Sequence, residues 1–301
     1  MRSSARSIVA LPALSLRCYF LLLFALFFLL LLSSPTGLAV AASNANTLYG
    51  ERVGCPNCNN DGSELSQLLQ KADALYASFK SKEALKELLK ILQLDPQNHE
   101  ALAKTSRVYI DFGDMIAESG PDWKEKRLKQ YLSAEEFARK AVKADPNGTW
   151  GHFYVAASLG KIALQSPISK QIDLAQEIRE EVERAIALDP QNGYAYHVYG
   201  VWHRKMAEIG QMKRVLASVV LWSSIPNGSM EKSVEYLKKA ISLNPKVISH
   251  HLELAKTYVA MGQWEPARSS LKSVQELPIR FSDDPLNKRE AEQLLEEIKD
   301  R

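Results

Sequence analysis

Apolar and small side chains recur along this chain at fixed distances from four prolines, Pro96, Pro146, Pro190 and Pro245. Each proline follows a stretch whose apolar residues have helical spacing, such as KELLKILQLDPQN at 86–98. Because proline has no N–H to continue the helical ladder, it marks the end of a helix. The prolines lie 50, 44 and 55 residues apart, so the sequence predicts a helical repeat of irregular length.

A small residue lies ten positions after each proline, and a small or apolar residue lies twelve positions before it. These offsets predict two helices per unit that cross closely at the small positions. The first helices contribute Ser106, Ala156, Gly200 and Ala255, and the second helices contribute Ala84, Ala134, Ile178 and Ser233. Within the middle three units the paired positions are 28, 22 and 33 residues apart, against 12 in the first unit. We therefore expect the extra residues to lengthen both helices, and the turn between them, in the middle units.

The segment SDDPLNKREAEQLLEEIKD at 282–300 predicts one further helix. Asp284 is the expected N-cap, and Pro285 would take the first helical position. One face of this helix is apolar and the other is charged, as the end of a repeat array requires. The apolar face consists of Ala291, Leu294, Leu295 and Ile298.

The unit resembles the tetratricopeptide repeat, a helix–turn–helix motif of about 34 residues. In the last unit, Ala255, Tyr258, Gly262, Ala267 and Leu271 fall where that motif has small, aromatic, turn, small and bulky residues. We predict an all-α fold over residues 64–301. Its architecture would be a right-handed α-solenoid of about five tetratricopeptide-like helix pairs, with extended middle repeats and a C-terminal capping helix.

Five such units with extended middle members resemble the regulator of microtubule dynamics family over roughly residues 64–300. The likeness is closest in YAYHVYGVWHRKMAEIG at 194–210, and it continues through 232–272. A small-x-Trp motif at 200–202 and the apolar, proline-containing insert at 215–229 also fit. The resemblance implies a protein without a catalytic centre. It also implies possible links to microtubules, membrane contact sites and lipid, which are attributed to animal members.

Residues 1–42 have the pattern of a secretory signal peptide or an N-terminal membrane anchor. A basic start precedes fourteen apolar residues, Tyr19 to Leu32, and the stretch 39–41 fits the small-x-small pattern of a signal peptidase site. Fourteen apolar residues are short for a membrane span of about 20, but the absence of charge between Arg17 and Glu51 leaves the anchor open. We expect an exported protein, periplasmic or membrane-associated through this segment.

The charge of the remaining chain argues against a nucleic-acid partner. Residues 1–42 contain three arginines and no acid, so the other residues carry equal numbers of basic and acidic groups. Binding of nucleic-acid phosphates needs clustered lysine and arginine, which this sequence does not show.

Residues 43–63 form a polar tether that contains Cys55 and Cys58 in a Cys-x-x-Cys motif. Such a pair can be a redox dithiol, half of a zinc site or a haem attachment. Haem needs a histidine at residue 59, which is asparagine, and a four-cysteine zinc site lacks its other ligands outside the leader. We expect a local disulfide, with intermolecular bridging or metal capture as alternatives, and no cofactor.

The repeat register points six side chains toward the wall formed by the first helices: Tyr76, Arg107, Phe153, His197, Arg204 and Lys256. Aromatic groups with a few cations suit an extended peptide or an anionic lipid headgroup, although such residues can also simply face water. The sequence has no phosphate-binding glycine loop and no serine elbow. It indicates an interaction scaffold for a protein or peptide. The alternatives are a lipid-binding carrier or membrane tether, and a thiol redox accessory protein.

Overall fold

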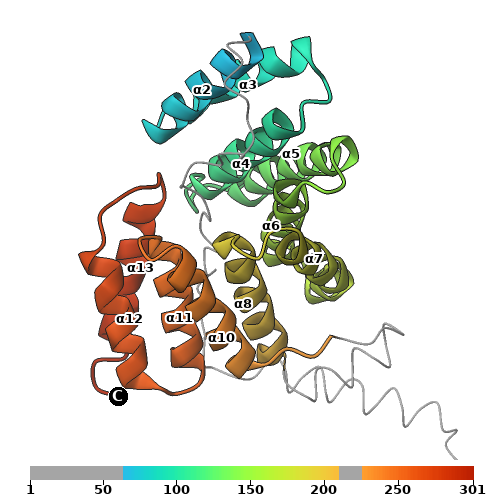
Figure 1. The fold of residues 1–301 in the computed structure, drawn as a ribbon. Helices are drawn as coiled ribbons and strands as arrows, with labels where there is room; N and C mark the ends of the chain where they lie inside the picture. Colours follow the sequence, from blue (N-terminus) through green and yellow to red (C-terminus); the bar gives the residue numbers. More distant parts are fainter. Residues whose placement is uncertain (1–63, 210–225) are drawn as a thin grey trace, which may run out of the picture. The chain divides into compact units, whose positions relative to one another are not determined.

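A computed structural model describes residues 64–209 and 226–301, and all the regular structure within these ranges is helical. Figure 1 shows the helices in chain order. They are α2 (Glu64–Ala77), α3 (Ser81–Leu94), α4 (His99–Asp114), α5 (Trp123–Ala144), α6 (Thr149–Leu164), α7 (Ile168–Leu188), α8 (Gly193–Glu208), α10 (Met230–Leu243), α11 (Ile248–Ala260), α12 (Trp264–Glu276) and α13 (Asp284–Glu297).

The helices pack in sequential pairs: α2 with α3, α4 with α5, α6 with α7, α8 with α10, and α11 with α12. The terminal helix α13 packs on both α11 and α12. The first helices of neighbouring pairs also contact one another, α4 with α6, α6 with α8, and α8 with α11. This arrangement confirms five helix pairs followed by a capping helix.

The recurring LDPQN stretch both ends one helix and begins the next. The Asp95 backbone N–H donates to the carbonyl of Ile91 at the end of α3. Two residues after the proline, the Asn98 side chain accepts a hydrogen bond from the Ala101 N–H at 3.0 Å and caps α4. Asn192 caps α8 in the same way, from the Ala195 N–H at 3.1 Å. The local sequence therefore sets the turn between successive pairs.

The crossing positions predicted from the prolines are buried. Ser106, Ala156 and Ala255 have no exposed surface. A Cβ added at Gly200 would lie 2.6 Å from the Leu237 Cγ, so only glycine allows α8 and α10 to approach this closely. Gly262, the predicted turn residue between α11 and α12, has a positive φ of 70°.

The middle units are longer, as predicted, but not all in the same way. The second helices α5 and α7 have 22 and 21 residues, against 14 in α3 and 13 in α12. In the fourth unit α10 has only 14 residues. The expectation of two lengthened helices is therefore wrong for this unit, whose extra residues lie between α8 and α10.

The capping helix begins one residue earlier than the sequence indicates. Its N-cap is Asp283 and its first residue is Asp284, with proline in the first turn. The Asp284 carboxylate instead accepts hydrogen bonds from the N–H groups of Arg280 and Phe281 at 2.7 and 2.8 Å, which fixes the segment before the helix. The predicted apolar face is confirmed, because its four residues belong to the C-terminal core cluster.

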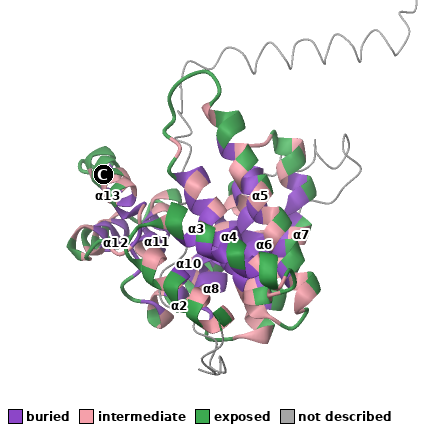
Figure 2. Cartoon of the chain, turned by 90° about the horizontal axis from the view of Figure 1, so that it is seen from above, coloured by how far each residue is buried: buried purple, intermediate pink, exposed green. Residues whose placement is uncertain are grey.

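From the second pair onward, the first helix of each pair is more deeply buried than the second. Twelve residues of α4 and twelve of α6 are buried, against five of α5 and six of α7. Figure 2 shows this contrast as purple α4 and α6 beside α5 and α7 with exposed green surface. No helix in the described ranges has the length and apolarity to cross a membrane.

Several sequence predictions fall outside the residues that the structure describes. These are the leader at 1–42, the tether at 43–63 with Cys55 and Cys58, and the apolar part of the insert at 215–222. They stay predictions.

Candidate functional site

The six predicted side chains all lie on first helices, and four of them are buried. Tyr76 is on α2, Arg107 on α4, Phe153 on α6, His197 and Arg204 on α8, and Lys256 on α11. Arg107, Phe153, His197 and Arg204 each expose 3% or less of their surface. The structure brings Arg204 and Lys256 into one charged group and Arg107 with Tyr76 into another, and Phe153 is connected through aromatic contacts to the histidine pair of the first. Their role in ligand binding stays a prediction.

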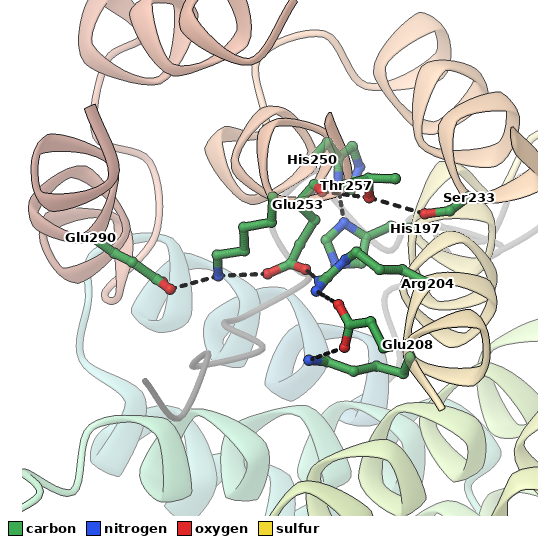
Figure 3. Close-up of polar contacts among 10 residues, drawn as sticks. His197, Arg204, Glu208, Ser233, His250, Glu253, Thr257 and Glu290 are labelled. Carbon is green, nitrogen blue, oxygen red and sulfur yellow. Dashed lines mark hydrogen bonds and ion pairs between the residues drawn. The ribbon is translucent and has the colours of Figure 1, made fainter. Parts of the chain in front are cut away.

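The first group is an ion-pair network that joins α8, α11 and α13 (Figure 3). Glu253 is at its centre and pairs with Arg204, and with Lys256 at 2.8 Å. Lys256 reaches Glu290 on α13, also at 2.8 Å, and Arg204 reaches Glu208 at 3.1 Å. We call these five residues the C-terminal network.

Charge pairing decides the protonation state of Glu253. Burial alone would raise the pKa of its carboxyl, but the cations Lys256 and Arg204 hold that pKa well below its usual value. The same pairing raises the pKa of the Arg204 guanidinium against the effect of burial. Both groups are therefore charged, and each supplies the opposite charge that makes burial of the other tolerable.

Two histidines complete the contact between α8 and α11. The Nδ1 atoms of His197 and His250 are 2.9 Å apart, so one must donate and the other accept. Burial lowers the pKa of His197 to about 3 and that of His250 well below its usual value. Beside them, the hydroxyls of Ser233 and Thr257 share a hydrogen bond of 3.0 Å.

Aromatic contacts connect Phe153 to this histidine pair. The Phe153 ring lies 6.3 Å from Tyr194, and Tyr194 lies 5.6 Å from His250. Trp150 and Tyr154 pack against the same phenylalanine, at 5.6 and 4.9 Å. Phe153 thus belongs to the core between α6 and α8.

The second charged group surrounds Arg107. Its guanidinium lies over the Tyr76 ring at 3.7 Å, and its distance to Asp73 is 3.8 Å. Asp73 accepts a much shorter hydrogen bond, 2.6 Å, from Lys104. Tyr76 and Arg107 also line a pocket of ≈330 Å³, together with Arg280 and Phe281 of the segment before α13.

Asp111, one turn after Arg107 on α4, is a buried carboxylate to which no hydrogen bond is made at conventional distance. Burial raises its pKa to about 7, although the nearby Tyr76 and Arg107 act to lower it. Lys161 on α6 does not neutralise it directly, because its ammonium pairs with both oxygens of Asp114 at 2.8 Å. The Tyr131 hydroxyl also donates to Asp114, at 2.7 Å.

An apolar pocket of ≈90 Å³ lies among α6, α7 and α8. Gly160 and Leu164 line it from α6, and Val198, Val201 and Trp202 line it from α8. The Trp202 indole N–H donates to the Ala175 carbonyl of α7 at 2.8 Å, so the polar edge of this ring is satisfied. What the pocket offers a ligand is mainly apolar surface.

Sequence reasoning missed the two carboxylates that matter most, Asp111 and Glu253. A signal was present, because each lies one helical turn from a predicted cation, four residues after Arg107 and three residues before Lys256. Within the described ranges no group of three or more histidine, cysteine, aspartate or glutamate side chains could hold a metal ion. The pocket beside Arg107 offers charged groups to a ligand, and the pocket among α6, α7 and α8 offers apolar surface.

Comparison with known proteins places these observations in a family. The family model for regulator of microtubule dynamics proteins 1–3 matches residues 68–299. Regulator of microtubule dynamics protein 1 of Bos taurus is 28% identical over 239 residues, which cover 79% of this chain and 73% of the relative. Protein 3 of Xenopus laevis is 28% identical over 238 residues, 78% of this chain and 49% of the relative.

The solved structure of a thermophilic TPR protein from Thermus thermophilus is similar in fold, with a TM-score of 0.55 at 17% sequence identity. The match covers 76% of this chain and 99% of that one. It supports the tetratricopeptide-like arrangement of helix pairs and, at this identity, nothing beyond the fold.

Proposed function

The chain belongs to the regulator of microtubule dynamics family, and from this membership we propose that it is a non-catalytic scaffold that binds a protein or peptide on its first helices. Stacked helix pairs offer a long binding surface, and function must then be argued from the side chains on it.

The apolar pocket among α6, α7 and α8 is the observation that carries this proposal. Its ≈90 Å³ equals roughly three water molecules in volume, which suits one small aliphatic side chain. Lys205 lines it and pairs at 3.1 Å with Glu208, one turn further along α8, and both side chains are partly exposed, so a charged pair lies beside the apolar lining. An extended peptide is typically recognised by such a combination of apolar side-chain pocket and polar neighbours.

Gly160 offers a direct test. It lines the pocket from α6, and a Cβ added there would meet no atom within 4 Å. Gly160→Leu places a branched side chain in this open space and should occupy the pocket, whereas Gly160→Ala adds only the Cβ, which meets no atom, and serves as the matched control. Each replaces a helical glycine and should not weaken the fold.

In affinity capture from the native host, we expect wild type and Gly160→Ala to retain a common protein partner and Gly160→Leu to lose it. Equal recovery of that partner by both variants would contradict binding at this pocket.

The apolar lining of the same pocket also favours the second candidate, a lipid-binding carrier or membrane tether. Native mass spectrometry of the purified chain distinguishes the two. A carrier should show bound lipid in wild type and Gly160→Ala and none in Gly160→Leu, and a peptide scaffold should show none in any of them.

We further propose export, or membrane association through residues 1–42, on the sequence pattern alone. Sequencing the N-terminus of the protein from its native host tests this. We expect a start at Ala42 for a cleaved signal, or an intact chain in the membrane fraction for an anchor. An intact chain in the soluble cytosolic fraction would contradict both. The thiol redox alternative rests on the sequence motif at 55–58, and thiol trapping of the native protein tests it.

A further inference from the structure

The Arg107 guanidinium has hydrogen-bonding capacity that the protein does not use. It is almost fully buried, its Nε has no partner, and its distance of 3.8 Å to Asp73 is too long for a hydrogen bond. Asp73 is already engaged by Lys104 at 2.6 Å. Leaving a buried charged donor unmet is costly, so the wall of the ≈330 Å³ pocket carries a cation that lacks an acceptor.

The spacing of Arg107 and Asp111 would allow them to pair with each other, but they do not. An ion pair with the same order and four-residue spacing forms elsewhere, between Arg204 and Glu208 at 3.1 Å. Here the guanidinium stacks on Tyr76 instead. Burial raises the pKa of Asp111, and the hydrogen bond from the Tyr76 hydroxyl and the charge of Arg107 lower it only in part. The stacking keeps Arg107 at the pocket and away from the carboxylate on its own helix.

The composition of the pocket selects the charge of a ligand. Its lining contains Arg107 and also Asp73, which already pairs with Lys104 at 2.6 Å. A monoanion can pair with the Arg107 guanidinium, whereas a doubly charged phosphate would be repelled more strongly by Asp73 and by Asp111 behind the wall. Apolar contact is available beside the cations, from Phe281 and from Ile279, which is half exposed.

From this geometry we propose that the pocket between α2, α4 and the 279–282 segment binds a carboxylate attached to an apolar group, with Arg107 as its principal donor. This chemistry is shared by the C-terminal end of a peptide and by free acyl or aromatic acids. The site is separate from the apolar pocket of the proposed function, so either can fail without the other.

Asp111 makes the binding depend on pH. Burial raises its pKa to about 7, so the carboxyl becomes neutral as the pH falls from 8 to 6 and stops repelling an anion held by Arg107. Affinity for a carboxylate ligand should therefore rise on acidification. The groups that act on Asp111 from the surrounding helices are Tyr76 of α2, Arg107 and Asp114 of α4, and Lys161 of α6.

Ligand-observed NMR with the full chain tests the proposal, using N-acetyl-phenylalanine and its amide as matched probes. Loss of one charge-assisted hydrogen-bond pair corresponds to about tenfold or more in affinity. At pH 6 we expect the acid to bind at least about tenfold more tightly than the amide. At pH 8 the acid should bind more weakly than it does at pH 6. Octanoate, run in parallel, distinguishes the ligand sources: tighter binding of N-acetyl-phenylalanine indicates a peptide end, and tighter binding of octanoate a free acid.

Two variants locate the effect. Arg107→Met should reduce binding of the acid to the level of the amide. Asp111→Asn, which keeps the shape and removes the charge, should strengthen binding at pH 8 by about three- to tenfold and flatten the pH dependence. Circular dichroism confirms that each variant is folded. Equal binding of acid and amide, no detectable binding of the acid, or tighter binding of inorganic phosphate would overturn the proposal, as would unchanged binding by Asp111→Asn at pH 8.

Discussion

Arg107 on α4 of the second helix pair and Lys256 on α11 of the fifth pair occupy equivalent positions. Each directly follows the small residue at which its helix crosses its partner. Their surroundings differ. Lys256 makes two ion pairs of 2.8 Å, with Glu253 and Glu290, and these tie α11 to α13. Arg107 makes one distant ion pair of 3.8 Å and lies near Asp111, a carboxyl whose pKa is raised by burial to about 7.

The contrast separates two uses of buried charge. In the C-terminal network each charged group has an opposite charge within hydrogen-bonding distance, which offsets the cost of removing it from water. Around Arg107 no hydrogen bond contributes: burial alone would lower the pKa of the guanidinium, and Tyr76, Tyr154 and the more distant Asp73 and Asp111 raise it instead. The Asp111 carboxyl is not compensated to the same extent, because burial raises its pKa to about 7. Groups that are buried with few hydrogen bonds are typical of functional sites.

Removal of the central acid should have the largest effect on stability. Glu253→Gln leaves Arg204 with only the partly exposed Glu208, and Lys256 with only Glu290. We expect the free energy of unfolding to fall by about 3 kcal/mol, because two cations lose the buried anion that they share. Urea denaturation measures it. Glu290→Gln is the matched control, since its side chain is more exposed, and should cost less; equal losses would show that the network is not centred on Glu253.

The two regions should also respond to pH in opposite directions. Burial lowers the pKa of His197 to about 3, of His203 to about 4, and of His250 well below its usual value. Below about pH 6.5 the unfolded chain therefore binds protons that the folded chain does not, and the free energy of unfolding falls. The pKa of Asp111 is raised by burial to about 7, so the folded chain takes up that proton first and acidification is stabilising there.

From pH 7 to pH 6 these opposing effects should leave a net loss of about 1 kcal/mol in wild type. Asp111→Asn lacks the compensating proton uptake and should lose about 2 kcal/mol over the same interval. Denaturation curves at the two pH values give both numbers. Parallel behaviour of the two proteins would mean that Asp111 does not titrate in this range.

Most of the fold could be predicted because it depends on local signals. The prolines and the small residues at the crossings, such as Ala156 and Ala255, are set by helix chemistry and close packing. The Asn98 cap is equally local, and the apolar face of α13 follows helical spacing. The sequence did not reveal that α10 of the fourth unit would keep only 14 residues, because the number of inserted residues does not determine whether they extend a helix.

The site was predicted only in part. The register correctly assigned residues such as Arg107 and Lys256 to the first helices, but it did not indicate how they are paired. Pairing depends on side chains far apart in the sequence, for example Lys104 with Asp73, and Lys256 with Glu290. That Arg107 would stack on Tyr76, and that the same tyrosine would act on Asp111, is a consequence of packing between α2 and α4.

Urea denaturation of Arg107→Met and Lys256→Met at pH 7 compares the two equivalent positions directly. In this account the buried charge of the C-terminal network stabilises the fold, whereas that of Arg107 is reserved for a ligand. Lys256→Met should therefore lower the free energy of unfolding by about 2 kcal/mol or more. Arg107→Met should cost clearly less, about 1 kcal/mol or below, because the lost cation had no hydrogen bond and methionine keeps part of the contact with the Tyr76 ring. A loss in Arg107→Met as large as that in Lys256→Met would contradict this distinction.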